Sequence, residues 1–166
     1  MKSRLLVLVL LFPLLLVACN RAEVTDVQRS ADGGIDATVT FTEDDLNTAI
    51  QEALAAGENP LLRNPQVDLQ PGQIVINGEH DQRDGSGTVS GTLTVAVTIE
   101  EGQLKTTVTA ATIESVPLSD TRVTQFNERL AEAFARRAAR DRGVITVKAV
   151  TITDTTFEVV VNAQRG

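Results

Sequence analysis

The feature that most constrains the fold is a long alternation of apolar and polar residues between positions 87 and 113. Odd positions from Val89 to Ile99 hold aliphatic residues and one glycine, whereas even positions hold Thr, Ser or Ala. This period of two is typical of a half-buried β-strand. Glu101-Gly102 then allows the chain to reverse, because glycine accepts a positive φ, and the alternation resumes at Gln103. The sequence therefore predicts a long antiparallel hairpin.

The first arm of this hairpin is too long to lie flat in a compact domain. At about 3.3 Å per residue it would span roughly 43 Å, whereas a domain of about 145 residues has a radius of gyration near ~15 Å. Either the arm curves or the domain is elongated. Gly91 and the phase slip at Ala110-Ala111 are the positions where we expect a bend or bulge.

The remaining chain is predicted to form further strands and two helices. Apolar alternation predicts strands over 35–41, 66–70, 73–79, 144–151 and 157–161. Thr42 caps a short helix that ends before Gly57 and Pro60, and Ser119 caps a longer amphipathic helix that reaches Arg142, with Gly143 as its stop. This order favours an α+β fold in which a strongly curved antiparallel sheet packs around one long amphipathic helix, with a second shorter helix.

Charge and composition exclude some classes of partner. The chain has 166 residues, a net charge of −7, five Phe and neither Tyr nor Trp. An acidic surface repels phosphate backbones and anionic bilayers, and few aromatic rings are present to stack on bases. We therefore expect no nucleic-acid partner, and a membrane contact only through a covalent or hydrophobic anchor.

The first twenty residues carry two basic residues, an apolar run from Leu5 to Val17 and the single cysteine. The run is short for a spanning helix and is interrupted by Pro13, so it predicts an export signal. Leu16-Val17-Ala18-Cys19 resembles the bacterial lipobox, which implies cleavage before Cys19 and lipidation of Cys19. The alternatives are a plain secretory signal with a stray cysteine and a short anchor helix.

These boundaries predict a domain organisation and a location. Residues 1–18 are a lipoprotein signal peptide, residues 19–34 a lipidated N-terminus and tether, and residues 35–166 a single α+β domain. The segment from Arg21 to Gly34 is either a tether or an edge strand, and we favour a tether that becomes a strand near Val24 to Gln28. The expected location is the cell envelope, on the outer face of the cytoplasmic membrane or on an outer membrane if present.

The sequence presents no catalytic constellation, so we expect neither enzyme activity nor a cofactor. His80 lies in a polar, Gly-rich stretch and is predicted to be solvated at the surface. Asp81 and Asp84 lack the spacing of a calcium loop, so no metal site is expected. A basic run comprises Arg136, Arg137, Arg140 and Arg142. It is interpreted as a solvated face that complements the helix dipole, with contact to lipid headgroups as the alternative.

Three features together resemble the tubular lipid-binding (TULIP) superfamily, nearest to its small bacterial branch of YceB-like envelope lipoproteins. They are the strand-to-helix segment 41–54 with its Asp45-Leu46-Asn47 signature, the long hairpin, and the helix from Ser119 to Arg142, behind a lipobox leader. The resemblance implies a curved sheet around a long helix, with an apolar groove that takes acyl chains. The chain is shorter than eukaryotic members and poor in Phe, which favours a small or closed cavity. The implied groove residues are Ile50, Leu54, Val89, Leu93, Val95, Val97, Ile99, Phe126, Leu130 and Phe134.

Two functions are thus compatible with the sequence. The first is a lipid-anchored, non-catalytic module that binds a lipid or another apolar ligand. The second is an anchored scaffold with a solid core that engages a protein partner, in which case the same apolar residues only form the core.

Overall fold

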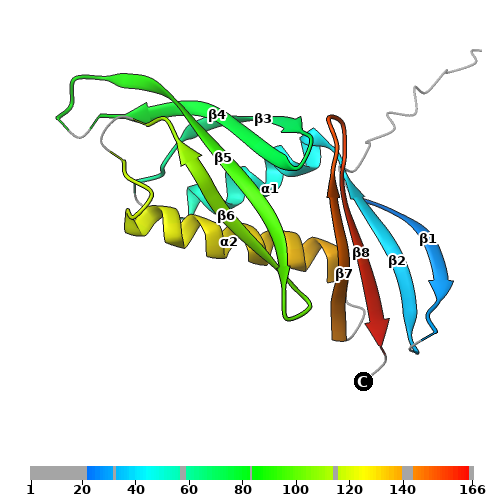
Figure 1. The fold of residues 1–166 in the computed structure, drawn as a ribbon. Coiled ribbons are helices and arrows are strands. Elements are labelled where there is room, and N and C mark those ends of the chain that lie inside the picture. Colours follow the sequence, from blue (N-terminus) through cyan, green and yellow to red (C-terminus); the bar gives the residue numbers. More distant parts are fainter. Residues whose placement is uncertain are drawn as a thin grey trace, which may run out of the picture.

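Two antiparallel sheets of four strands and two helices make up the described part of the chain (Figure 1). The computed structural model describes residues 22–31, 33–56, 59–82, 84–113, 116–139 and 144–164. The predicted signal peptide, Cys19, the helix stops Gly57 and Gly143, and Arg140 and Arg142 lie outside these residues. The elements are β1 (Glu23–Arg29), β2 (Ile35–Phe41), α1 (Glu43–Ala55), β3 (Arg63–Gln70), β4 (Gln73–Asp81), β5 (Thr88–Glu100), β6 (Gln103–Ala111), α2 (Thr121–Ala139), β7 (Val144–Ile152) and β8 (Phe157–Gln164).

The α+β class and the two helices are confirmed, but the prediction of one sheet is wrong. The strand orders are β1-β2-β8-β7 in the first sheet and β3-β4-β5-β6 in the second. β2 pairs along its whole length with β8, from Ile35 opposite Ala163 to Phe41 opposite Phe157. α2 carries the chain from β6 to β7. The C-terminal hairpin, β7 and β8, then pairs with the N-terminal strand β2 and not with the β5–β6 hairpin.

The predicted long hairpin is confirmed as β5 and β6. Glu101 and Gly102 both adopt positive φ, at 51° and 75°, which matches the twist of a tight hairpin turn. The register slips between the pairs Thr94–Ala110 and Val95–Val108, so a bulge lies at the predicted phase slip. Gly91 has a different role, because a Cβ atom there would lie 2.8 Å from Cδ2 of Leu62.

Both helices begin with side-chain caps. The Thr42 hydroxyl accepts from the Asp45 backbone N–H and the Asp45 carboxylate accepts from the Thr42 N–H at 3.0 Å, which completes a capping box. The prediction that Ser119 caps the second helix is wrong. Asp120 takes this place, because its Oδ1 accepts from the Arg122 N–H at 2.9 Å. Among the described residues, neither helix is long and apolar enough to cross a membrane.

The folded region begins earlier than the predicted domain boundary at residue 35. The strand predicted near Val24 to Gln28 is confirmed as β1, which pairs with β2, and Ala22 before it is buried. β1 carries a register shift between Thr25 and Gln28, with Asp26 at a φ of 49°. Seven residues of the predicted tether, Glu23–Arg29, are therefore part of a sheet.

Side chains or turns form hydrogen bonds with the edge strands β3, β6 and β7. Asn47 and Glu43 of α1 accept from the β3 amides of Val67 and Leu69, both at 2.9 Å. Asn127 of α2 accepts from the β6 amide of Val108 at 3.0 Å. At β7, the Gly72 N–H donates to Ile152 and the Gly102 carbonyl accepts from Val147. Three of the four sheet edges formed by the described residues are thus partly capped.

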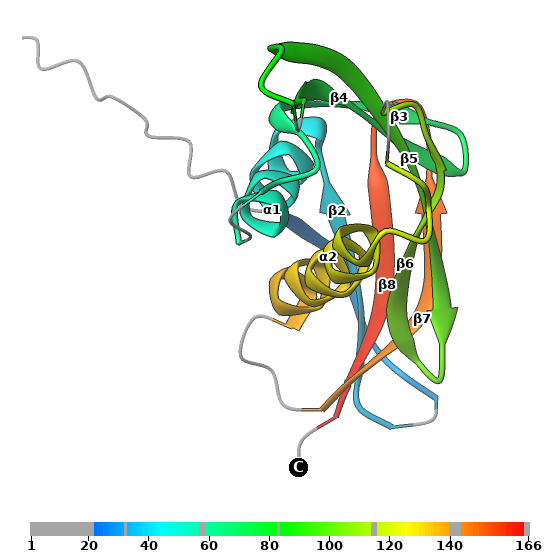
Figure 2. The same ribbon diagram turned by 90° about the vertical axis from the view of Figure 1, so that its left-hand side faces the viewer.

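Three phenylalanines join the two halves of the molecule. Phe41 of β2, Phe134 of α2 and Phe157 of β8 are fully buried, with ring centroids 5.1 to 6.1 Å apart. α1 and α2 lie side by side in both views, α1 along β3 and α2 along β6 (Figures 1 and 2). The core therefore runs continuously from one sheet through the helices to the other.

Candidate functional site

The middle of the predicted groove is closed in this structure. Five of its residues have 0 % exposed surface, namely Ile50, Leu93, Val95, Leu130 and Phe134. A side chain with no exposed surface borders no space that a water molecule could fill, either outside or in an internal cavity. These residues pack together as core, and they leave no room for an acyl chain between them.

Three further predicted groove residues lie towards the ends of the apolar face of β5. Val89, at one end, and Val97, near the other, are half-buried. Ile99 lies beyond Val97 and is 38 % exposed. They share a strand face with Leu93 and Val95, but the structure does not bring them together with the pocket described next.

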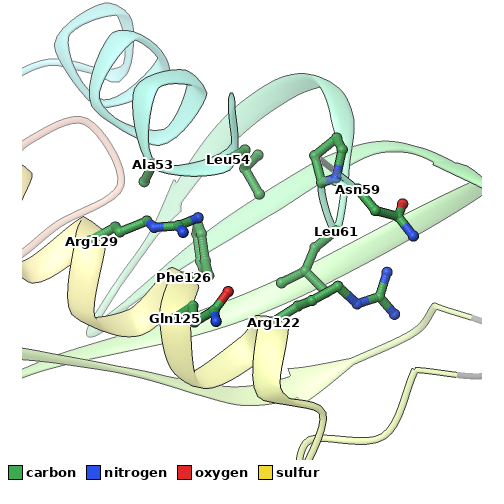
Figure 3. A pocket seen from close by; sticks show the side chains of 9 residues that line it. Ala53, Leu54, Asn59, Leu61, Arg122, Gln125, Phe126 and Arg129 are labelled. Atoms are coloured by element: carbon green, nitrogen blue, oxygen red, sulfur yellow. The ribbon is translucent and has the colours of Figure 1, made fainter. Parts of the chain in front are cut away.

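Leu54 and Phe126, the two remaining groove residues, meet at a pocket between the end of α1 and the start of α2 (Figure 3). The pocket has a volume of about 140 Å³ and is partly open to solvent. Ala53 and Leu54 approach it from α1, and four side chains approach it from the first three turns of α2 (Figure 3). The described residues that line it are Ala53, Leu54, Asn59, Pro60, Leu61, Arg122, Gln125, Phe126 and Arg129.

The third wall of this pocket is the loop 59–62, which is held by His80. His80 is only 3 % exposed, and its Nδ1 lies 2.9 Å from the carbonyl oxygen of Leu61. Because a carbonyl oxygen only accepts, Nδ1 carries the hydrogen and donates it. The predicted solvated histidine is therefore wrong. β4 extends to Asp81, and its alternation turns His80 to the same inner face as Ile74 and Ile76.

A pair of glycines fixes the neighbouring residue of the loop. Gly78 of β4 lies directly opposite Gly91 of β5, and Leu62 packs over both. A Cβ atom on Gly78 would lie 2.7 Å from the Arg63 carbonyl oxygen and 3.1 Å from Cβ of Leu62. The loop therefore takes its position from the second sheet, and so does the pocket wall.

The rim of the pocket is polar and cationic. Nε and Nη2 of Arg122 donate to the two carboxylate oxygens of Asp120, each at 3.0 Å, and its Nη1 is buried without an acceptor among the described residues. Arg129 is half-buried and forms no hydrogen bond or ion pair with any described residue. Gln125 and Asn59 add amide groups to the same rim.

The comparisons with known proteins assign no family. The chain matches no protein-family model and no curated protein.

The sequence argument missed the polar residues of this pocket. Arg122, Gln125, Phe126 and Arg129 follow the spacing i, i+3, i+4, i+7, which places them on one helix face. Only the apolar member, Phe126, belongs to the predicted groove. The loop residues Asn59 and Leu61 carried no such pattern, because their position depends on His80 and Gly78.

The other candidate groups are engaged elsewhere. Arg137 of the basic run bridges to Glu52 of α1 at 2.9 Å, so it joins the two helices, whereas exposed Arg136 lies 3.7 Å from Glu132. Asp81 pairs with Arg63 at 2.6 Å. Hydrogen bonds from Ser86 hold the pKa of Asp84 below its ordinary value. No group of three potential metal ligands occurs among the described residues.

Proposed function

We propose that this chain is an exported lipoprotein of the cell envelope, anchored through Cys19, that binds a small apolar or amphiphilic ligand between α1 and α2. The pocket with Leu54, Phe126 and Leu61 on its apolar side carries the proposal. Concave, mostly apolar sites with a few polar groups are typical of ligand-binding pockets. The resemblance to tubular lipid-binding proteins, and the strong curvature that it implies for the sheet beside the long helix, remain predictions within this proposal.

The size of the pocket limits what enters it. Its volume of about 140 Å³ is close to the ~150 Å³ of an engineered cavity that binds one benzene molecule. Pockets for drug-sized ligands are larger, at about 300 to 1,000 Å³. The bound portion is therefore one ring or a short aliphatic segment. A complete acyl chain requires the α1–α2 contact to part.

The lining favours binding over catalysis. The polar side chains among the described lining residues are two arginines and two amides. Guanidinium groups donate hydrogen bonds and accept none, and amides are not nucleophiles, so none of these four residues serves as a general base or nucleophile. The proposed activity is accordingly retention of a ligand, without a chemical step.

The proposed anchor would hold the domain close to the bilayer. β1 begins at Glu23, four residues after Cys19. At no more than about 3.6 Å per residue, this link reaches roughly 14 Å. Acyl chains contribute about 0.8 kcal/mol per buried CH₂, so a lipidated Cys19 would retain the acidic domain at the membrane.

The ligand is tested by filling the pocket. The full-length chain is expressed in a bacterial host, purified, and extracted for mass spectrometry of bound small molecules and lipids. We expect a bound species that falls at least tenfold in Ala53→Met, because the longer side chain occupies the pocket, and that persists in Ala55→Met on the exposed face of α1. Equal amounts in both variants, with circular dichroism unchanged, would contradict the proposed site.

The anchor is tested in the same host. Mass spectrometry of the N-terminal peptide should show acylated Cys19, and the protein should sediment with membranes. Cys19→Ser should lose the acyl mass and move to the soluble fraction. Unmodified Cys19 in the membrane-bound wild-type protein would contradict the anchoring proposal.

A second candidate, an anchored scaffold, is favoured by exposed apolar side chains on β1 and β2. Val27 of β1 and Ile35 of β2 are 59 % and 46 % exposed, and the predicted interior groove is closed. A crosslinkable amino acid at position 27 should then capture one defined envelope protein, whereas the same group at exposed Asp68 should not. The scaffold fails if position 27 yields the same products as position 68.

A further inference from the structure

We propose that the ligand of the α1–α2 pocket carries an anionic group, a carboxylate or a phosphate monoester, and that Arg129 is its main recognition residue. The inference rests on the proposed function, since it specifies the chemistry of the same site. It starts from the charge of the lining. The nine described residues that line the pocket include two arginines and no carboxylate, although the chain as a whole has a net charge of −7.

Arg129 is the cation that lacks a counter-charge. It is half-buried, reaches toward Phe126 from α2 (Figure 3), and pairs with no acceptor among the described residues. Two carboxylates on the helices have other cationic neighbours, since Glu132 lies 3.7 Å from Arg136 and Glu52 lies 2.9 Å from Arg137. A partly desolvated guanidinium with unused donors binds an anion more strongly than a neutral acceptor.

Arg122 provides a second argument for an anionic ligand. Its two hydrogen bonds to Asp120 neutralise much of its charge but hold the guanidinium in one orientation, with a side chain only 17 % exposed. The buried Nη1 is left without an acceptor in the described part of the chain. A buried donor without a partner costs free energy, and an anionic oxygen within reach would remove that cost.

The apolar side of the pocket defines the rest of the ligand. Leu54, Leu61 and Phe126 accept a ring or an aliphatic segment, while Gln125 and Asn59 add amide N–H donors beside the arginines. Arg122 lies in the first turn of α2, where the helix dipole also favours negative charge. The geometry thus matches a small organic acid or the acid end of a longer amphiphile.

The test compares acids with alcohols that have the same apolar group. The full-length protein is placed in phosphatidylcholine nanodiscs, and dissociation constants are measured by ligand-observed NMR, with empty nanodiscs subtracted. The probes are benzoate, benzyl alcohol, hexanoate and hexanol. We expect each acid to bind about tenfold more tightly than its alcohol, as for hydrogen bonds to a charged group. Tighter binding of hexanoate than of benzoate indicates a lipid-derived acid, and tighter binding of benzoate than of hexanoate indicates a soluble aromatic acid. Both results support the inference.

Two variants separate recognition from folding. Arg129→Gln should remove the preference for the acid and leave alcohol binding unchanged, whereas Arg136→Gln, one exposed position on the same helix, should keep the preference. If acids and alcohols bind wild-type protein equally, or if Arg129→Gln retains the preference, the anionic inference is overturned while the pocket stands. If no probe binds, the proposed pocket and the inference both fall.

Discussion

At the scale of single residues, the carboxylate of Asp36 joins three strands of one sheet. It accepts from Nδ2 of Asn162 in β8 at 2.6 Å and lies 3.2 Å from Nζ of Lys148 in β7. Lys148 also donates to the hydroxyl of Ser30, just beyond β1. The Asn162 hydrogen bond, with a smaller contribution from Lys148, lowers the pKa of Asp36 below its ordinary value of 3.8.

This network predicts an acid-dependent loss of stability. A carboxyl group whose pKa is lower in the folded state stabilises the fold at pH values above its unfolded pKa, and the contribution disappears as pH falls through the folded pKa. We expect the denaturant concentration at the unfolding midpoint to decrease as the pH is lowered below 4. This decrease should be less steep in Asp36→Asn. The measurement is chemical denaturation from pH 7 to pH 2.5. Asp154→Asn, at an exposed turn position, should keep the wild-type slope; equal slopes in wild type and Asp36→Asn would contradict the prediction.

The predicted environment of His80 depended on where the strand β4 ends. The sequence predicted a strand that ends at Glu79, which put His80 in a polar loop. The alternation of Ile74, Ile76 and Gly78 continues inward for one more step, and the ring meets the Leu61 carbonyl. The parity of position 80 was visible in the sequence, but its partner was not, because Leu61 precedes it by 19 positions.

At the scale of elements, local patterns predicted most strands and both helices. Period-two alternation located β2, β5, β6 and β8, and the Thr42 cap located the start of α1, because these depend on neighbouring residues. Side chains that bridge two elements left no local pattern. Asn47 and Asn127 look like surface residues of a helix, but each accepts from a strand amide.

Asn127 provides the test of this edge capping. Its Oδ1 accepts from the Val108 N–H, so Asn127→Ala leaves that amide without its acceptor. We expect a loss of about 1 kcal/mol in the free energy of unfolding. We also expect faster hydrogen exchange at the Val108 amide. Glu128→Ala, at the next and exposed position, is the control. Unchanged protection of Val108 in Asn127→Ala would show that the bond does not cap the strand.

At the scale of the whole molecule, the two sheets share one core. The Phe41–Phe134–Phe157 cluster links β2 and β8 to α2, and the turns at Gly72 and Gly102 bond to the edge of β7. The sequence did not reveal this division into two sheets. Pairing of β2 with β8 joins residues more than a hundred positions apart, and no local period encodes such a contact.

A shared core predicts that the sheets unfold together. Phe157→Ala removes a fully buried ring and should cost about 3 to 5 kcal/mol. Native-state hydrogen exchange should then show the same loss of protection for amides of β8 and of β4. Phe157→Leu should cost less, because it retains most of the buried volume. Protection that persists in β4 while β8 exchanges would mean that the sheets unfold as separate units.

The pocket has two unlike sides, because the loop 59–62 packs on Gly78 and Gly91 whereas the other side is a helix face. One side is built into the second sheet through His80, Gly78 and Gly91, so a change there disturbs the fold itself. The opposite side consists of Arg122, Gln125 and Arg129 on one helix, where only Arg122 is tied to a neighbour. Ligand preference can therefore diverge at Gln125 and Arg129 while the scaffold stays constant, which makes these two positions the natural place to re-engineer selectivity.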